Sequence, residues 1–258
     1  MSVQISLTGL SFLVKNTDSN ETHFFTENKF DGTRSPEEIE LEIDTILSET
    51  DALQLPFTEV TLIYTNTIYT TVPASLFDES KASEYLKFNS KILANDFIAF
   101  DTVETQDLVV VYIPFVNINN YFFDRFGSFQ YFHGTSIFLK KILSAEKYSI
   151  VSKFYMHVQE DQFDCISIKN GALQLCNTYS YKTPEDFIYY TLFCLEQLKL
   201  NPDSLSVFIC GEIDENDANY KMLYTYIRNI SFLKTESDLV IDGASQTTHK
   251  KFIIKNAL

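Results

Sequence analysis

The sequence predicts an α/β protein built from two copies of one strand-strand-strand-helix-strand unit. Two observations predict it. The same order of elements occurs at residues 3–65 and again at residues 153–210, with approximately the same element lengths. In addition, both helices begin with a hydroxyl residue, a proline and two acidic residues. Five elements in one order, with the same helix start, indicate a structural duplication.

The first unit is defined by alternating apolar residues and one helix start. Alternation of period two predicts strands at residues 3–8, 10–16, 22–27 and 57–65, with a helix to about residue 49 before the last strand. That helix opens at Ser35-Pro36-Glu37-Glu38. Serine caps the free amides, proline suits the first helical position, and the two acids favour the positive end of the helix dipole.

The second unit repeats this order. We predict strands at residues 153–159, 163–169, 172–179 and 205–210, with a helix from about 184 to 200 before the last strand. Asn170-Gly171 is a strong hairpin signal between two of these strands. Thr183-Pro184-Glu185-Asp186 opens the helix, as in the first unit. Because Phe187–Leu198 is apolar nearly all round, we expect this helix to be buried on more than one side.

The rest of the chain is also α/β. We predict an extended segment at 70–77, a helix at 78–88, a hairpin at 97–113, helices at 117–126, 135–145 and 217–230, and an extended segment at 129–133. The C-terminal stretch 231–258 has no clear periodicity. We expect it to add one or two strands, at 238–242 and 251–255. The expected domains are residues 1–115, with an inserted α/β segment at 70–113, and residues 116–258.

Composition excludes several classes of function. The chain of 258 residues carries a net charge of −15, which repels phosphate backbones and anionic lipid surfaces. Nucleic-acid binding is therefore not expected, and the adjacent basic pairs Lys140-Lys141 and Lys250-Lys251 are interpreted as solvated positions. No apolar run approaches the ~20 residues of a membrane span, and the first residues do not resemble a signal peptide.

The four cysteines and the many aromatic residues are open to simple interpretations. No C-x-x-C pair is present and each cysteine lies in an apolar run, so we expect reduced, buried thiols, no structural zinc and a cytoplasmic protein. The 23 phenylalanines and 15 tyrosines fill the core or, alternatively, form an exposed contact surface.

The duplicated unit resembles the layout of the actin-like, RNase-H-fold ATPase superfamily, which includes actin, heat-shock ATPases, sugar kinases and the pilus-assembly protein PilM. The segments FDCISIKNG, ALQLCNTYS and VFICGE of the second half look most like PilM-type proteins. The segments VQISLTGLSFLV, HGTSIFL, VQEDQFDCISIKNG, YKTPEDFIYY and EQLKLNP are similar to a family of uncharacterised Bacteroidetes proteins, and this likeness covers nearly the whole chain. The resemblance implies two RNase-H-like lobes in an actin-like ATPase arrangement.

The same resemblance implies ATP between the halves, with two hairpin turns around its phosphates and glycines that allow close backbone approach. The first turn, residues 6–11, keeps Thr8, Gly9 and Ser11 but lacks the expected aspartate. The second turn, residues 157–162, has no glycine and carries two acids. The adenine-side motif keeps a single glycine, Gly211, before another acid. These departures indicate that the fold is kept and the ATPase site is lost.

Two smaller constellations remain open. His157 with Glu160, Asp161 and Asp164 is either a small metal cluster or, the favoured interpretation, a solvated hairpin tip with a strand histidine, because alternation turns these side chains to different faces. The segment 133–136, His-Gly-Thr-Ser, precedes a helix and either binds an anion or caps the helix. A two-metal nuclease needs several converging acids, which the first strands do not supply.

The sequence therefore predicts a non-catalytic scaffold or adaptor that binds a protein partner and needs no cofactor or metal. The alternative is an ATP-binding, actin-like ATPase with an atypical site, in which Thr8, Gly9, Ser11 and Gly211 would contact Mg-ATP. Binding of a small ligand is a third alternative. The partner, its pathway and the oligomeric state are not encoded in any pattern that we recognise.

Overall fold

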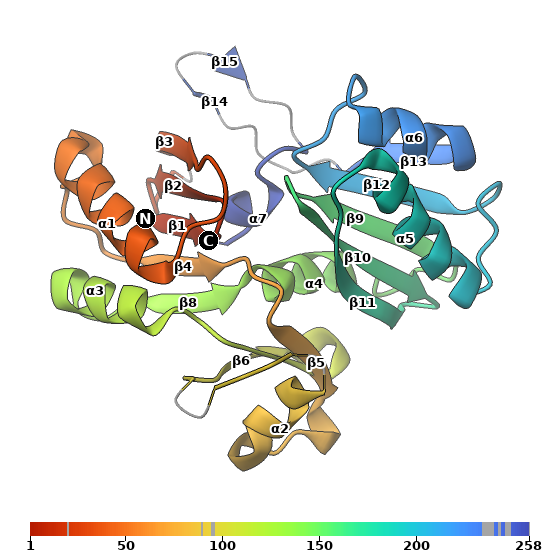
Figure 1. Ribbon diagram of the computed structural model, residues 1–258, viewed down its shortest axis with the longest axis horizontal. Coiled ribbons are helices and arrows are strands. Elements are labelled where there is room, and N and C mark those ends of the chain that lie inside the picture. Colours follow the sequence, from red (N-terminus) through yellow and green to blue (C-terminus); the bar gives the residue numbers. More distant parts are fainter. Residues whose placement is uncertain are drawn as a thin grey trace. The chain divides into compact units, whose positions relative to one another are not determined.

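The computed structural model describes residues 1–19, 21–88, 90–93, 96–233, 240–241, 244–245 and 249–257. The chain forms two compact units (Figure 1). Unit 1 contains Met1–Phe138 with short pieces of the C-terminal chain, among them Val240 and Ile254, and unit 2 contains most of the chain from Leu139 onward.

Unit 1 is built on a five-stranded sheet of order β3-β2-β1-β4-β8. Strands β1, β2 and β3 are antiparallel neighbours, whereas β4 runs parallel to β1 and β8 runs parallel to β4. The elements are β1 (Ser2–Ile5), β2 (Gly9–Lys15), β3 (Thr22–Lys29), α1 (Pro36–Glu49), the 3₁₀ turn η1 (Asp51–Leu53), β4 (Thr61–Tyr64), α3 (Val116–Phe126) and β8 (Gln130–His133). Helix α4 (Gly134–Ala145) begins in unit 1 and ends in unit 2. Helices α1 and α3 contact each other and lie side by side in Figure 1.

Unit 2 repeats this sheet strand by strand, with the order β11-β10-β9-β12-β13. Its elements are β9 (Lys153–Val158), β10 (Gln162–Lys169), β11 (Ala172–Ser180), α5 (Pro184–Gln197), β12 (Ser206–Gly211), α6 (Ala218–Tyr226) and β13 (Asn229–Phe232). Helix α7 (Phe252–Lys255) begins in unit 2 and ends in unit 1. Again the first three strands are antiparallel, and β12 and β13 continue the sheet in parallel. The predicted duplication is confirmed, and it extends further than expected, because α6 and β13 correspond to α3 and β8.

A small α/β segment follows β4. It has its own three-stranded sheet of order β5-β7-β6. Its elements are β5 (Tyr69–Pro73), η2 (Ala74–Leu76), η3 (Glu79–Lys81), α2 (Ala82–Lys87), β6 (Ala99–Val103), η4 (Glu104–Gln106) and β7 (Leu108–Tyr112). Helix α2 covers this sheet by placing Ala82 and Leu86 against Val72, Val109 and Val111.

Local signals read from the sequence account for both main helices. Ser35 and Thr183 each accept a hydrogen bond from the backbone amide three residues later, and the carboxylates of Glu38 and Asp186 accept one from the cap amide. Both helices therefore begin with a complete capping box. The Asn170-Gly171 turn also forms, and Asn170 has a φ of 53°, as such a turn requires.

Two expectations need correction, and a third is met in the residues that the structure describes. The helix predicted at 217–230 ends at Tyr226, and Asn229–Phe232 forms β13 beside β12, because the Ile230 and Phe232 side chains continue the sheet core. Residues 251–255 contribute to the helix α7 and not to a strand. At 238–242, the described residues Val240–Ile241 form the short strand β14, which pairs with β15 (Ala244–Ser245), and the remaining positions lie outside the described residues.

Unit 1 continues to Phe138, because β8 pairs with β4. The sequence placed the boundary after residue 115, within a range of about 115–150. Helix α5 is not buried on all sides, because Tyr189 and Phe193 are exposed while Phe187 and Leu195 are buried. Within the described residues, no helix combines the length and the apolar character needed to cross a membrane.

Candidate functional site

The turn between β1 and β2 contains Thr8 and Gly9, and Ser11 follows in β2. The hydroxyl oxygen of Ser6 donates to the Gly9 carbonyl oxygen at 3.0 Å and accepts from the Thr8 amide at 3.3 Å. Ser11 is buried within β2. A Cβ on Gly9 would lie 2.9 Å from the carbonyl oxygen of Asn28 in β3, which explains the glycine without a ligand. The polar groups of this turn thus bind one another.

The turn between β9 and β10 is held by Tyr181. Its hydroxyl donates to the Gln159 carbonyl oxygen at 2.6 Å, and its amide donates to the Asp161 carbonyl oxygen at 2.9 Å. Burial raises the pKa of Tyr181 to about 12, and the charge of Asp161 adds to the effect. Glu160 and Asp161 are exposed at the tip of the turn. Two carboxylates there oppose the binding of a triphosphate.

Gly211 ends β12 in a conformation that suits only glycine, with a φ of +93°, and a Cβ would collide with the carbonyl oxygen of Val158. Its amide donates to the His249 carbonyl oxygen at 2.9 Å. The His249 ring stacks on Phe232 with a centroid distance of 4.1 Å, and its Nε2 donates to the Ile213 carbonyl oxygen at 2.8 Å. The glycine predicted to face adenine is therefore bonded to the C-terminal part of unit 2.

Two lysines complete this contact. Lys251 Nζ lies 2.8 Å from Glu212 Oε1, and Lys250 Nζ lies 3.6 Å from Asp214 Oδ2. The Lys251 side chain is 9% exposed, so its interpretation as a solvated position is wrong. We call His249–Lys251 the C-terminal cover. Any ligand that used the Gly211 amide would have to displace it.

The row of polar residues beside this glycine is buried. His157 Nδ1 and Asp164 Oδ2 are 3.1 Å apart at paired positions of β9 and β10, and Thr178 Oγ1 donates to Asp164 Oδ1 at 2.5 Å. His157 is the expected strand histidine, and Glu160 and Asp161 form the exposed tip, but Asp164 is buried and does not belong to that tip. Among the described residues, no group of three or more histidine, cysteine or acidic side chains can hold a metal ion.

The segment 133–136 opens α4 and lies next to a carboxylate of the protein itself. Asp101, in β6, accepts a hydrogen bond from the His133 amide at 2.8 Å and another from the Tyr112 hydroxyl at 3.0 Å. Asp101 is buried, and burial together with its charge raises the pKa of Tyr112 far above the ordinary value. Sequence reasoning missed Asp101, although an acid between apolar strand residues is a signal for a buried polar contact.

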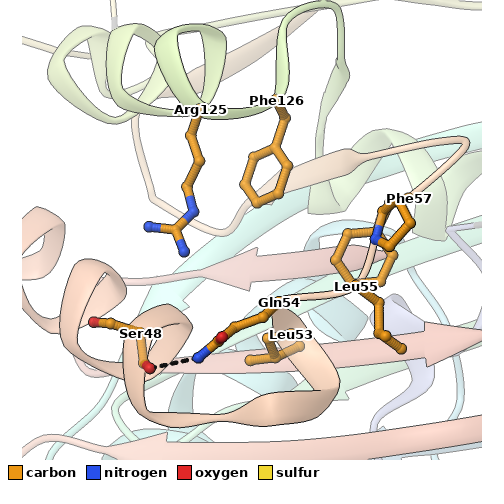
Figure 2. A pocket seen from close by; sticks show the side chains of 8 residues that line it. Ser48, Leu53, Gln54, Leu55, Phe57, Arg125 and Phe126 are labelled. Atoms are coloured by element: carbon orange, nitrogen blue, oxygen red, sulfur yellow. Dashed lines mark hydrogen bonds between the residues drawn. The ribbon is translucent and has the colours of Figure 1, made fainter.

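A surface groove of unit 1 escaped sequence reasoning altogether. One cavity of about 660 Å³ lies where α1, η1 and α3 end, and Figure 2 shows its lining. Arg125 lies on one side with Ser48 and Gln54, and apolar side chains line the other. A second cavity of about 480 Å³ shares Arg125 and lies between Glu40 of α1 and Asp124 of α3. We call these two cavities the α1–α3 groove. A third cavity, of about 350 Å³, shares the loop 55–57.

The polar contacts along the groove fix Arg125. Its Nη1 lies 3.5 Å from Asp44 Oδ1 and donates to the Tyr121 hydroxyl oxygen at 3.0 Å. That hydroxyl donates to Asp44 at 2.7 Å. Burial and this hydrogen bond raise the pKa of Tyr121 to about 12, so the phenol stays protonated at neutral pH. The charge of Arg125 is thus neutralised by its own unit.

Comparison with known proteins agrees with this architecture. The family model described as "Protein of unknown function (DUF3822)" matches residues 1–230. The chain belongs to this family. None of the curated proteins matches the chain in sequence.

Solved structures show the fold. A protein of Bacteroides thetaiotaomicron with an actin-like ATPase fold and unknown function superimposes with a TM-score of 0.80 at 18% identity, over 90% of this chain and 89% of that one. The PilM-PilN type IV pilus biogenesis complex gives a TM-score of 0.57 at 11% identity, over 90% of this chain and 87% of that one. The chain therefore has the actin-like ATPase fold, as its sequence suggested, with similarity to PilM.

Proposed function

We propose that the chain is a non-catalytic scaffold or adaptor of actin-like fold that binds a protein partner in the cytoplasm and needs no nucleotide or metal. The observation that carries the proposal is the hydrogen bond from the Gly211 amide to the His249 carbonyl. Because the C-terminal cover uses this amide, the glycine retained from the nucleotide-binding pattern serves the protein's own chain.

Two further observations support an adaptor. The turns 6–9 and 159–162 bond to themselves or to Tyr181, and the second presents two carboxylates where the fold would hold phosphates. PilM, which shares the fold, is part of a complex with PilN. A folded framework that has lost its nucleotide contacts retains surfaces for protein binding.

The cytoplasmic location is part of the proposal and is supported by the cysteines. Cys165, Cys176, Cys194 and Cys210 form no disulfide. The sulfur atoms of Cys165 and Cys194 are 4.0 Å apart and share a hydrogen bond, not a disulfide. Reduced thiols in this proximity suit a reducing compartment.

Thermal unfolding with Mg-ATP tests the loss of the nucleotide site. A ligand present at ~100 times its Kd adds about 2.7 kcal/mol to the free energy of unfolding. We expect no change in melting temperature at millimolar Mg-ATP, Mg-ADP or Mg-GTP. A rise with Mg-ATP that the variant Gly211→Ala abolishes would establish the alternative, an ATP-binding protein, and refute the proposal.

Reconstitution with a purified partner tests the adaptor role. The tagged chain is used to capture proteins from cells that express it naturally, and each captured protein is produced alone and mixed with the chain. We expect a complex of fixed stoichiometry in size-exclusion chromatography with light scattering. Failure of every captured protein to form such a complex would contradict an adaptor role.

A further inference from the structure

The α1–α3 groove has one apolar end and one acidic end. At the apolar end, the rings of Phe57 and Phe126 lie with centroids 6.2 Å apart, and Leu53, Leu55 and Pro56 complete the lining (Figure 2). Leu55 is 46% exposed although it belongs to this apolar wall. An apolar wall open to solvent in a cavity of about 660 Å³ is large enough to hold a big aliphatic or aromatic side chain.

The loop that forms the apolar wall is held in place by hydrogen bonds. The Gln54 side-chain amide donates to the Ser48 carbonyl oxygen at 2.6 Å, and its backbone amide donates to Asp51 at 3.1 Å. These bonds also satisfy carbonyl groups near the end of α1, which lack partners inside the helix. The wall is thus preformed, and a ligand would not have to order it.

The other end of the groove is acidic. Helix α1 carries six carboxylates and no basic residue, and α3 carries one acid, Asp124, and one base, Arg125. Glu40 lines the cavity from α1 and accepts a hydrogen bond from Asn117 at 2.8 Å. Since Arg125 is paired with Asp44, the walls present uncompensated negative charge. Such a wall attracts cationic side chains and repels phosphate and anionic lipid.

We infer that the α1–α3 groove binds a basic segment of the partner protein, with a large apolar side chain in the apolar end and lysine or arginine side chains beside Glu40 and Asp124. This inference rests on the proposed adaptor function and names the chemistry of its partner. Charge complementarity selects the occupant. An acidic segment would meet repulsion along α1, and a wholly apolar one would leave the carboxylates without counter-charges.

Fluorescence anisotropy with a defined pair of peptides tests the inference. The first probe is a short labelled peptide with leucine and phenylalanine at its centre and lysines on both sides, and the second has glutamates in place of the lysines. We expect the full chain to bind the basic peptide, more weakly as salt rises, and not to bind the acidic one. Equal binding of both peptides, or no binding of the basic peptide, would overturn the inference.

Surface variants locate the binding. Leu55→Lys places a cation in the apolar wall and should lower the affinity for the basic peptide about tenfold, as the loss of a central anchor does. Asp124→Lys reverses an exposed charge and should lower the affinity for the same peptide about threefold. The matched controls are Leu76→Lys, at a leucine that is 70% exposed in the inserted segment, and Glu84→Lys on α2. An equal loss of affinity in the control variants would mean that the peptide binds elsewhere, and it would refute the inference that the groove is the binding site.

Hydrogen exchange of the unaltered protein gives a readout that needs no substitution. We expect the basic peptide to protect amides at 48–57 and 117–126 and to leave the inserted segment unchanged. Protection confined to other parts of the chain would contradict the inference. If a reconstituted partner binds while the basic peptide remains bound in the groove, the groove inference fails and the adaptor function stands.

Discussion

The two repeated units use the same topology with helices of different character. Helix α1 buries three side chains against its sheet, Ile39, Ile43 and Leu47, and exposes a carboxylate-rich surface. Helix α5, at the equivalent place in unit 2, buries five, Phe187, Ile188, Thr191, Cys194 and Leu195, and exposes two aromatic rings. The difference shows that strand order and helix start define the unit, while helix faces diverge freely. Substitutions of core residues, glycines, a buried carboxylate and helix caps test this comparison.

Truncation of the core under each helix should have the largest effect. Phe187→Ala removes a ring packed edge-on to Phe163 at 4.8 Å, and should lower the free energy of unfolding by about 4 kcal/mol. Ile43→Ala, also fully buried, should cost about 3 kcal/mol. Urea unfolding followed by circular dichroism and tyrosine fluorescence measures both, since the chain has no tryptophan. A smaller loss for Phe187→Ala than for Ile43→Ala would contradict the deeper packing of α5.

The two glycines predicted to contact a nucleotide, Gly9 and Gly211, should differ next. Gly211→Ala puts a side chain at a positive φ and drives its Cβ into the carbonyl oxygen of Val158, so it should lower the free energy of unfolding by about 3 kcal/mol. Gly9→Ala meets only the Asn28 oxygen at 2.9 Å and should cost about 1 kcal/mol. Gly32→Ala, with a φ of +90° and open space around it, isolates the backbone strain and should also cost about 1 kcal/mol. Equal losses at Gly211 and Gly32 would show that the collision is relieved.

A buried carboxylate of unit 2 should make its stability depend on pH. Burial alone would raise the pKa of Glu146, but hydrogen bonds from Lys153 at 2.7 Å and Tyr155 at 2.6 Å outweigh it and hold the pKa below its ordinary value. A depressed carboxyl pKa stabilises the fold above the unfolded pKa, ~4.3, and the stabilisation disappears as pH falls through the folded pKa.

The variant Glu146→Gln tests this dependence. At neutral pH it should lower the free energy of unfolding by about 2 kcal/mol, because charge-assisted hydrogen bonds are lost. The difference in the free energy of unfolding between the unaltered protein and the variant should disappear as the pH falls below ~4. Unfolding by urea at a series of pH values measures it. A gap that stays constant down to the acid limit would mean that Glu146 acts only through packing.

The helix caps should show the smallest effect and the greatest similarity between units. Ser35→Ala and Thr183→Ala each remove a side-chain acceptor from a capping box and should cost about 1 kcal/mol. Ser48→Ala, at an exposed position in the last turn of α1, is the control and should change little. Markedly different losses at the two caps would mean that the shared helix start has unequal weight in the two units.

Much of the fold follows from local patterns, and the exceptions have physical causes. Ser35-Pro36 and Thr183-Pro184 mark their helices, and period-two alternation marks the first three strands of each unit. The end of α6 was misjudged because Ile227 and Ile230 continue its helical spacing, although β13 begins at Asn229. Pairing beside β12 overrides that local preference.

The candidate sites were less accessible to sequence reasoning. The hydrogen bond between Gly211 and His249 joins residues far apart in the chain, and no local sequence pattern predicts it. The α1–α3 groove depends on where Leu55, Phe57 and Arg125 meet, which only tertiary structure decides. In contrast, the missing aspartate and the acids Glu160 and Asp161 were visible as departures from the superfamily pattern.

The C-terminal cover has a consequence for synthesis of the chain. The Gly211 amide receives its partner only when His249 has been made. At ~5–20 residues per second, a ribosome needs about 2–8 s to translate the stretch between them. During that interval the Gly211 amide at the end of β12 lacks this partner, so the contact between them can form only late in synthesis.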